Sequence, residues 1–599
     1  AISMAACTST ASSSTASATA SAASKTLTAG TYTATATGHN GNVTVEVTVS
    51  ADSIDDVKVT DSKETAGLAD PAIEQIPTWI VENQSISADM VSGATYTSVA
   101  IETAVADAIT QAGGDPSAWR IKHESSEKGT TEQLSSDVIV IGGGGAGMTA
   151  TIRLEELGKN VILVEKTSSL GGTIRVSGGN QVVTGSALQQ EAGVTDDSAE
   201  SMEEDFLKNG DNKNNTTLLG IYAENVGETT DWLNQTVGVQ FDMETGLHKL
   251  AEYSNNRELA YTGGGAGAAV TMADAVDQSG AQVLLNTTAT ALTVTDGKVT
   301  GVTATTTTGK TYELTADSVV LATGGYGNND DLLPESASEG LFYGLDSSNG
   351  SGLLMATIDG VDAATVNMDY VKEYPNGIET SKKHAKSTIA GNIAAFGMSA
   401  ILVNKDGDRV VNEKDSNKNI LAALQAQDDQ ELYLVMDAET YDTWKTKLTG
   451  AGISEEFLEQ WLQNNGSSEP ILTTGSTIEE AAKAAGIDGT KLQKTVDTYN
   501  GYVASGTDTE FGRSADYMTQ SIGDGPYYIC EQKARYATTM GGLSVDENLQ
   551  VVNTSGTAID GLYAAGEIIG GTMGTDSPSG ANNGWAVTSG KYVAEVLAK

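Results

Sequence analysis

The sequence predicts an α/β protein built around a Rossmann-like dinucleotide-binding domain, with a small α+β module ahead of it. Residues 136–141 (SDVIVI) end in an apolar run typical of a buried strand, and four glycines follow at 142–145. A helical pattern, a second apolar run at 161–164 and Glu165 come next. Upstream, residues 31–59 alternate apolar and polar side chains with the period of two that antiparallel strands require.

Composition excludes several classes of function. The 599 residues include 34 basic and 79 acidic side chains, a formal net charge of −45. Nucleic acid is therefore not an expected partner, because phosphate binding needs clustered Lys and Arg. Cys7 and Cys530 are the only cysteines and there are four histidines, so iron–sulfur, CxxCH haem and Cys-rich zinc sites are excluded and no metal site is expected. Redox chemistry would require an organic cofactor.

The first 25 residues predict a lipoprotein tether. Met4-Ala5-Ala6-Cys7 resembles a bacterial lipobox, in which small residues precede a cysteine that becomes lipidated, and a Ser/Thr/Ala-rich run follows to Lys25. We expect an extracytoplasmic protein anchored to the outer face of the cell membrane only through a lipidated Cys7. The alternative is an Ala-rich tail that contains one cysteine by chance.

Residues 26–114, here called the N-terminal module, contain a specific phrase. Asp89-Met90-Val91-Ser92-Gly93-Ala94-Thr95 resembles the flavinylation motif of FMN-binding domains in respiratory flavoproteins. The resemblance implies FMN joined to the Thr95 hydroxyl by a dedicated flavin transferase, with Asp89 and Ser92 as recognition residues. A small Gly-Ala pair before a helix N-terminus also suits a phosphate. The alternative is an ordinary strand-to-helix turn.

The glycine-rich turn predicts dinucleotide binding by Gly142, Gly144, Ala146, Gly147 and Glu165. The acid follows Gly142 by 23 residues, a spacing that suits a bond to a ribose hydroxyl. Strand, glycines, helix, strand and acid occur in the order that the binding unit requires. The turn alone does not say which dinucleotide is bound.

Later phrases resemble fumarate reductase and succinate dehydrogenase flavoproteins, and this resemblance implies non-covalent FAD in a glutathione-reductase-type domain. The phrases are KTSSLGGTIRVSGG from Lys166, ATGG from Ala322, TMGG from Thr539 and GLYAAGE from Gly561. The further cofactor-binding residues that it implies are Lys166, Gly171, Gly172, Thr323, Gly324, Gly325, Gly541, Gly566 and Glu567.

The layout is similar to that of exported fumarate and urocanate reductases, in which an inserted clamp closes over the substrate. By this resemblance a linker spans 115–135 and the FAD-binding domain, here the central domain, spans 136–368 and 536–599. An α+β substrate clamp spans 369–535. Within it, Ala400-Ile401-Leu402-Val403-Asn404 and the segment 407–413 match a family motif at the root of the clamp.

The catalytic set of that family is missing here. The place of its proton-donating arginine is occupied by Asn417, that of a carboxylate-binding histidine before TMGG by Ala537, and that of a second carboxylate-binding arginine by Ser577. A dicarboxylate would be buried in the substrate site without cationic partners, which costs roughly several kcal/mol. The replacements therefore predict a neutral substrate, such as a ketosteroid-like or aromatic enone.

A different proton donor is then needed, and tyrosine is the best available class. The candidates are Tyr374, Tyr370 and Tyr536, although any of them could simply be a half-buried aromatic residue. Arg535 is a candidate carboxylate ligand, and an enoate substrate becomes possible if its side chain faces the site. Otherwise Arg535 is a hinge or surface residue.

The sequence thus predicts an FAD-dependent reductase of activated C=C bonds that serves anaerobic respiration. Electrons would pass from a membrane-side donor, flavinylated or quinol-linked, to FMN, to FAD and then as hydride to a small unsaturated molecule. Three alternatives remain open: an enoate reductase of the fumarate, urocanate or cinnamate type, a ketosteroid-type dehydrogenase, and a non-catalytic electron-transfer flavoprotein.

Overall fold

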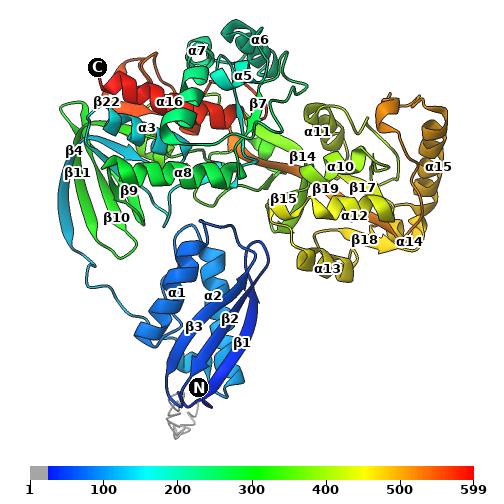
Figure 1. Cartoon of the computed structure of the whole chain (residues 1–599), viewed down its shortest axis with the longest axis horizontal. Helices are drawn as coiled ribbons and strands as arrows, with labels where there is room; N and C mark the ends of the chain where they lie inside the picture. Colours follow the sequence, from blue (N-terminus) through cyan, green and yellow to red (C-terminus); the bar gives the residue numbers. More distant parts are fainter. Residues whose placement is uncertain (1–24) are drawn as a thin grey trace, which may run out of the picture.

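The computed structural model describes residues 25–599, so the lipobox and most of the predicted tether lie outside the described residues. Figure 1 shows the N-terminal module in blue beneath the central domain, with the clamp beside both. Within residues 25–599 no helix has the length and apolarity needed to cross a membrane. The same residues contain no group of three His, Cys, Asp or Glu side chains arranged to hold a metal ion.

The N-terminal module is a three-stranded antiparallel sheet with two helices on one face. The strands are β1 (Gly30–Thr37), β2 (Asn42–Val49) and β3 (Ile54–Ser62), and the helices are α1 (Asp70–Asn83) and α2 (Thr95–Gln111). The alternation in β2 buries every second residue, Val43 through Val49, against these helices. A short 3₁₀ turn, η1 (Pro116–Trp119), begins the linker.

The central domain is a mixed sheet in the order β21-β22-β11-β4-β5-β8, with β10 and β9 continuing antiparallel from β11. Strands β4, β5, β8, β11 and β22 run parallel. Their carboxyl ends therefore meet at one edge, where ligands bind in open α/β sheets. The bounds are β4 (Thr131–Ile141), β5 (Val161–Val164), β8 (Gln282–Leu284), β9 (Thr287–Thr295), β10 (Lys298–Thr306), β11 (Thr311–Leu321), β21 (Gln550–Val552) and β22 (Ala558–Ala564).

Helices cover this sheet and short strands line its ligand edge. The helices are α3 (Gly145–Glu156), α4 (Gly172–Val176), α5 (Ala187–Glu191), α6 (Ala199–Asn209), α7 (Thr216–Trp232), α8 (Gly264–Ser279), α9 (Ser351–Thr357) and α16 (Ala581–Leu597), with the short turns η2 (Leu233–Val237), η3 (Glu335–Ala337) and η6 (Gly566–Ile568). The short strands pair as β6 (Asn180–Val182) with β7 (Glu258–Ala260) and β13 (Thr365–Val366) with β20 (Gly542–Leu543).

The clamp is built on a seven-stranded sheet in the order β12-β15-β14-β19-β17-β16, with β18 added to β19. The strands are β12 (Leu341–Phe342), β14 (Val371–Ser381), β15 (His384–Ser387), β16 (Ile401–Val403), β17 (Glu431–Met436), β18 (Leu472–Gly475) and β19 (Tyr527–Thr539). The helices are α10 (Ile389–Phe396), α11 (Asn417–Gln425), α12 (Ala438–Thr446), α13 (Glu455–Asn464), α14 (Ile478–Ala484) and α15 (Gly489–Ser505), with η4 (Thr449–Ala451) and η5 (Ala515–Tyr517).

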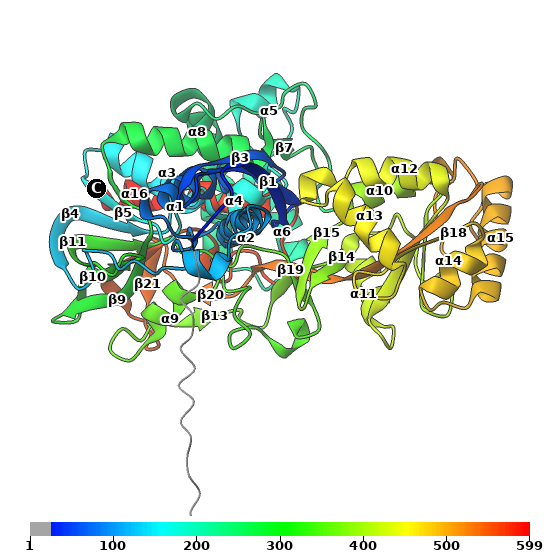
Figure 2. The same cartoon turned by 90° about the horizontal axis from the view of Figure 1, so that it is seen from below.

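Two long strands join the clamp to the central domain. β14 and β19 pair antiparallel and extend from one body into the other, as Figure 2 shows. β19 is continuous across residues 535 and 536, where the sequence places a domain boundary. A strand pair shared by two domains fixes the direction of every side chain along it, so residues of β14 and β19 are suited to line a site between them.

The clamp motif at 407–413 forms a buried ionic network. Arg409 donates to both carboxylate oxygens of Glu413, at 2.9 and 2.8 Å, and to Asp508 at 3.0 Å. Arg513 joins Glu413 at 3.4 Å and donates to the Ala400 carbonyl at 2.8 Å. The network ties together segments far apart in the sequence and gives the motif a structural role. The α/β fold with an inserted clamp and a small α+β module, as predicted, is confirmed.

Candidate functional site

Glycine allows the turn after β4 to pack without side chains. A Cβ on Gly142, whose φ is +105°, would collide with the Ala322 carbonyl, and a Cβ on Gly147 would collide with the Gly142 carbonyl. A Cβ on Gly144 would instead point into open space, with its nearest neighbour the Gly172 Cα at 3.9 Å. The turn and the uncapped N-terminus of α3 therefore leave room for a phosphate.

Glu165 holds this turn in place. Its Oε2 accepts a hydrogen bond from the Gly143 amide at 2.7 Å, and its Oε1 accepts from the amide and the hydroxyl of Thr167, both at 2.8 Å. An ionised carboxylate has about four acceptor positions, so capacity remains for a ribose hydroxyl. Lys166 donates to the Ser347 carbonyl, and burial lowers the pKa of its amine.

The other predicted cofactor residues converge on the same edge. Gly172 lies against Gly144, where a Cβ would stand 2.8 Å from the Gly144 Cα. Gly324 has a φ of +75° and open space where a Cβ would be, and the half-buried Glu567 accepts from the Thr539 amide at 3.0 Å. Burial raises the pKa of Glu567 to about 7. The remaining members of this set are Ala146, Gly171, Thr323, Gly325, Gly541 and Gly566, which lie in or beside the turns after β4, β5, β11, β19 and β22.

The predicted flavinylation phrase forms a turn at the start of α2. Thr95 is exposed as the first residue of this 17-residue helix, and no side chain in the described part of the chain caps the helix N-terminus. Gly93 has a φ of +84°, and Ser98 closes the turn by accepting from the Val91 amide and donating to the Ala94 carbonyl. Free amides next to an exposed hydroxyl fit a phosphate joined to Thr95. Asp89 is exposed, and the Ser92 carbonyl contacts the central domain.

A second cluster forms between β14 and β19. Tyr374 pairs with Arg535 in the strand register, so the two side chains share one face of the sheet. The Arg535 guanidinium lies between two rings, 4.3 Å from the centre of Tyr343 and 4.4 Å from that of Tyr374. Its Nε donates to the Asn376 side chain at 2.9 Å, and the residue is only 3% exposed. Within residues 25–599 no protein group accepts from its Nη1 or Nη2.

Lys372 adds a second cation beside Tyr374. Its Nζ lies 2.7 Å from Asp576 Oδ1 and 4.8 Å from the centre of the Tyr374 ring. Burial alone would lower the pKa of this amine, but Tyr374 and Asp576 hold it above its ordinary value. Burial raises the pKa of Tyr374, which therefore keeps its proton at neutral pH. The two cations correct the expectation of a cluster without positive charge.

The cluster also includes two of the replaced family positions. Asn417 begins α11 and accepts from Asn376 Nδ2 at 3.5 Å. The Ser577 amide donates to Asp576 Oδ1, and its hydroxyl accepts from Asn582. Lys372, Tyr343 and Asp576 were not among the residues predicted from the sequence. The sequence offered one signal for Lys372, which lies two positions before the candidate Tyr374. Two residues at this spacing share a face only if the segment is a strand, so the signal could be used only once the strand was known.

The structure does not bring Tyr536 or Tyr370 into this cluster. Tyr536 pairs with Glu373 on the opposite face of the sheet and packs 5.9 Å from Phe342. It lines a separate cavity of about 370 Å³, and burial raises its pKa to about 12. The backbone carbonyl of Tyr370 accepts from the Met540 amide, which places Tyr370 beside the TMGG turn.

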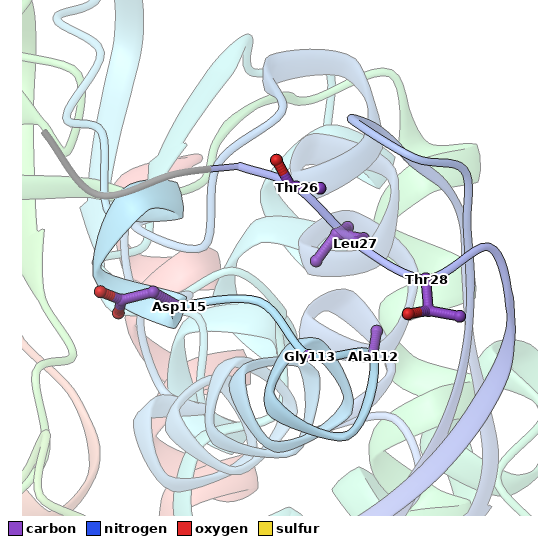
Figure 3. A pocket seen from close by; sticks show the side chains of 6 residues that line it. All are labelled: Thr26, Leu27, Thr28, Ala112, Gly113 and Asp115. Atoms are coloured by element: carbon purple, nitrogen blue, oxygen red, sulfur yellow. The ribbon is translucent and has the colours of Figure 1, made fainter.

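Another cavity, of about 340 Å³, lies at the far end of the N-terminal module. It is lined by Thr26, Leu27, Thr28, Ala112, Gly113 and Asp115, as Figure 3 shows. Ala112 follows the C-terminus of α2, so a helix of 17 residues, about 25 Å long, separates this cavity from Thr95. It therefore takes no part in the site at the start of α2.

Comparisons with known proteins agree with this organisation. Residues 137–583 match the family described as an FAD binding domain, and residues 38–110 match an FMN-binding domain. The chain is 33% identical over 546 residues to a urocanate reductase from Eggerthella lenta, covering 89% of this chain and 86% of the relative. It is 30% identical over 475 residues to a cytochrome-type fumarate reductase from Shewanella frigidimarina, covering 77% of each.

A solved structure shares the same architecture. The open conformation of a flavocytochrome c3 fumarate reductase superposes with a TM-score of 0.65 at 28% identity, over 81% of this chain and 84% of that one. The predicted resemblance and the two flavin-binding domains are thereby confirmed, and the enzyme class is an FAD-dependent oxidoreductase acting on C=C bonds. The chain belongs to the FAD-binding-domain family of flavoproteins that includes the urocanate and fumarate reductases, and it carries an FMN-binding domain ahead of that domain.

Proposed function

We propose that this enzyme reduces a C=C bond conjugated to a carbonyl group in a small neutral molecule, an enone. The observation that carries the proposal is the buried Arg535, held between two tyrosine rings, with neither Nη atom having an acceptor among residues 25–599. Bound FAD supplies the hydride. Negative charge then develops on the carbonyl oxygen, and the Nη donors of Arg535 are suited to stabilise it.

Tyr374 is the proton donor in this proposal. Its pKa is raised by burial, so its hydroxyl holds a proton at neutral pH. Lys372 and Arg535 lie within 5 Å of its ring and favour the phenolate that remains after proton transfer. The hydride and the proton go to the two alkene carbons, which balances the reduction.

The charges disfavour a dicarboxylate. Two carboxylates need two available cations, but Asp576 already neutralises Lys372 at 2.7 Å. One carboxylate of a bound dicarboxylate would therefore be buried without a cationic partner, at a cost on the order of several kcal/mol. Arg535 alone can hold a single carboxylate with two parallel hydrogen bonds. This favours an aromatic monocarboxylate enoate as the second candidate substrate class.

An anaerobic substrate panel tests the proposal. Holoenzyme is reduced with a viologen dye, and dye oxidation is followed with neutral enones including 3-ketosteroids, with cinnamates, and with urocanate and fumarate. Turnover of neutral enones, slow or no turnover of fumarate, and a loss of about 10²–10⁴-fold in kcat for Tyr374→Phe are expected. Rapid turnover of fumarate would contradict the charge argument, and an unchanged kcat in Tyr374→Phe would contradict the proton donor.

We propose further that the electrons arrive through FMN joined to Thr95 by a flavin transferase, from a flavinylated or quinol-linked donor at the membrane. The exposed hydroxyl at the uncapped start of α2 supports the attachment. The lipobox-like Met4-Ala5-Ala6-Cys7 supports an extracytoplasmic protein anchored through Cys7. Expressed in a bacterial host behind a lipoprotein signal peptide supplied for the experiment, the protein is expected in the membrane fraction, and Cys7→Ala is expected to release it. Equal partitioning of the two proteins would contradict the anchor.

A further inference from the structure

The start of α2 is not open to solvent on every side, because the central domain packs against it. The Ser92 carbonyl accepts from both the amide and the hydroxyl of Ser168, each at 3.0 Å. A Cβ on Gly93 would stand 3.0 Å from the Thr167 Cβ. These contacts join the flavinylation phrase directly to the segment that follows Glu165. The predicted FMN-carrying residue, Thr95, is two positions further along the chain.

The same junction contains a buried cation without sufficient partners. Arg175, on α4 of the central domain, is 5% exposed, and its Nη2 donates to the Leu170 carbonyl. Its Nε and Nη1 are buried and have no hydrogen-bond partner within residues 25–599. No carboxylate of the described residues lies within ion-pair distance of this guanidinium; burial lowers its pKa, and the charge of Asp70 only partly opposes that effect. Leaving a buried charged donor unpaired costs more than an ordinary hydrogen bond contributes.

Arg175 faces the N-terminal module. A Cβ on Gly67 of the module would collide with Arg175 Nη1, so the loop before α1 packs directly on the guanidinium. That loop borders the first turn of α2, because the Thr97 hydroxyl donates to Glu64 Oε2 at 2.6 Å. On its other side, Arg175 bonds Leu170 only two residues after Ser168. The cation therefore lies between the two segments that flank the start of α2.

We infer that Arg175 is a ligand, supplied by the central domain, for an anionic oxygen of the FMN carried by Thr95. The unpaired Nε and Nη1 would take either the phosphate or the pyrimidine edge of the flavin ring, both of which offer oxygen acceptors. The FMN site is then completed only when the module is docked on the central domain. This inference rests on the covalent attachment proposed above.

The test is the Arg175→Met variant, with Arg175→Lys as the conservative variant and Arg120→Met, an exposed arginine of the linker, as the control for lost charge. Fluorescence of the denatured protein band first establishes that each variant carries covalent FMN. Wild-type protein without such a band would refute the attachment itself. The ligand inference is judged on proteins that carry the band.

Phosphorus NMR and redox titration of the holoproteins then distinguish the two oxygens. If Arg175 binds the phosphate, the FMN phosphodiester resonance shifts in Arg175→Met while the FAD pyrophosphate resonances stay. If it binds the ring, the FMN midpoint potential falls, because a cation stabilises the negative charge of reduced flavin. If Arg175 binds reduced FMN more tightly than oxidised FMN, a tenfold loss of that ratio lowers the potential by about 30 mV for a two-electron couple. Arg175→Lys should show a smaller change than Arg175→Met in whichever signal moves. Arg120→Met should match wild type.

Two results would overturn the inference. A shift confined to the FAD resonances or the FAD potential would assign Arg175 to the other flavin. Unchanged FMN resonance and potential in Arg175→Met would show that the guanidinium does not contact FMN. If Arg175→Met does not fold, Arg175→Lys and Gly67→Ala replace it. The latter forces a Cβ against Nη1 from the module side and should move the same FMN signals.

Discussion

Replacing Thr95 with alanine is expected to abolish covalent FMN and, with it, electron delivery from the proposed membrane-side donor. A phosphoester needs the Thr95 hydroxyl, which is exposed at the uncapped start of α2. FAD should remain bound, because Gly142, Gly147 and Glu165 lie in another domain. Turnover with the natural donor should fall at least about 100-fold, whereas viologen dyes that reach FAD directly should still support reduction.

The control for this prediction is Thr97→Ala on the same helix turn. Thr97 is buried and its hydroxyl donates to Glu64, so it is not available to a transferase. Denaturing gels viewed under ultraviolet light, together with intact mass, measure FMN attachment. Thr95→Ser should keep some FMN, and Thr97→Ala should keep it all. A fluorescent band of wild-type intensity in Thr95→Ala would place the attachment elsewhere.

Replacing Arg535 with methionine is expected to lower kcat/KM by about 10²–10³-fold, the usual effect of removing one donor to a developing oxyanion. Methionine fills similar space between Tyr343 and Tyr374 but offers no donor to a carbonyl. Arg535→Lys should recover only part of the activity, because an ammonium cannot keep the Nε bond to Asn376 and also present two donors. Steady-state kinetics with the best substrate of the panel measure the effect.

Tyr536→Phe is the matched control for Arg535, since it changes the next residue of the same strand. Tyr536 points to the opposite face of the sheet, toward Phe342. Loss of the Tyr536 hydroxyl should leave kcat/KM within about twofold of the wild-type value. FAD absorbance should be the same in all three variants. A large loss in Tyr536→Phe together with near-normal Arg535→Met would place the substrate on the other face of β19.

Short sequence segments were sufficient to predict the two cofactor-binding frameworks. The glycines at 142 and 147 and the acid at 165 lie within one strand–turn–helix–strand unit, so their relation follows from local geometry. The flavinylation phrase likewise lies within seven consecutive residues that form one turn. Gly93 and Gly142 adopt a positive φ, and Gly147 has no room for a Cβ. Both conditions favour glycine, so they can be recognised from the glycines of a short segment.

The membership of the cluster between β14 and β19 depended on the tertiary structure. Arg535, Tyr374 and Asp576 come from three distant segments, and the pairing register of β14 with β19 sets the face on which each strand residue lies. A shift of one residue would exchange Arg535 for Tyr536, because side chains alternate along a strand. The three tyrosine candidates were therefore equivalent in the sequence. Arg175 required the same information, since its packing against Gly67 joins two domains by contacts that no local pattern encodes.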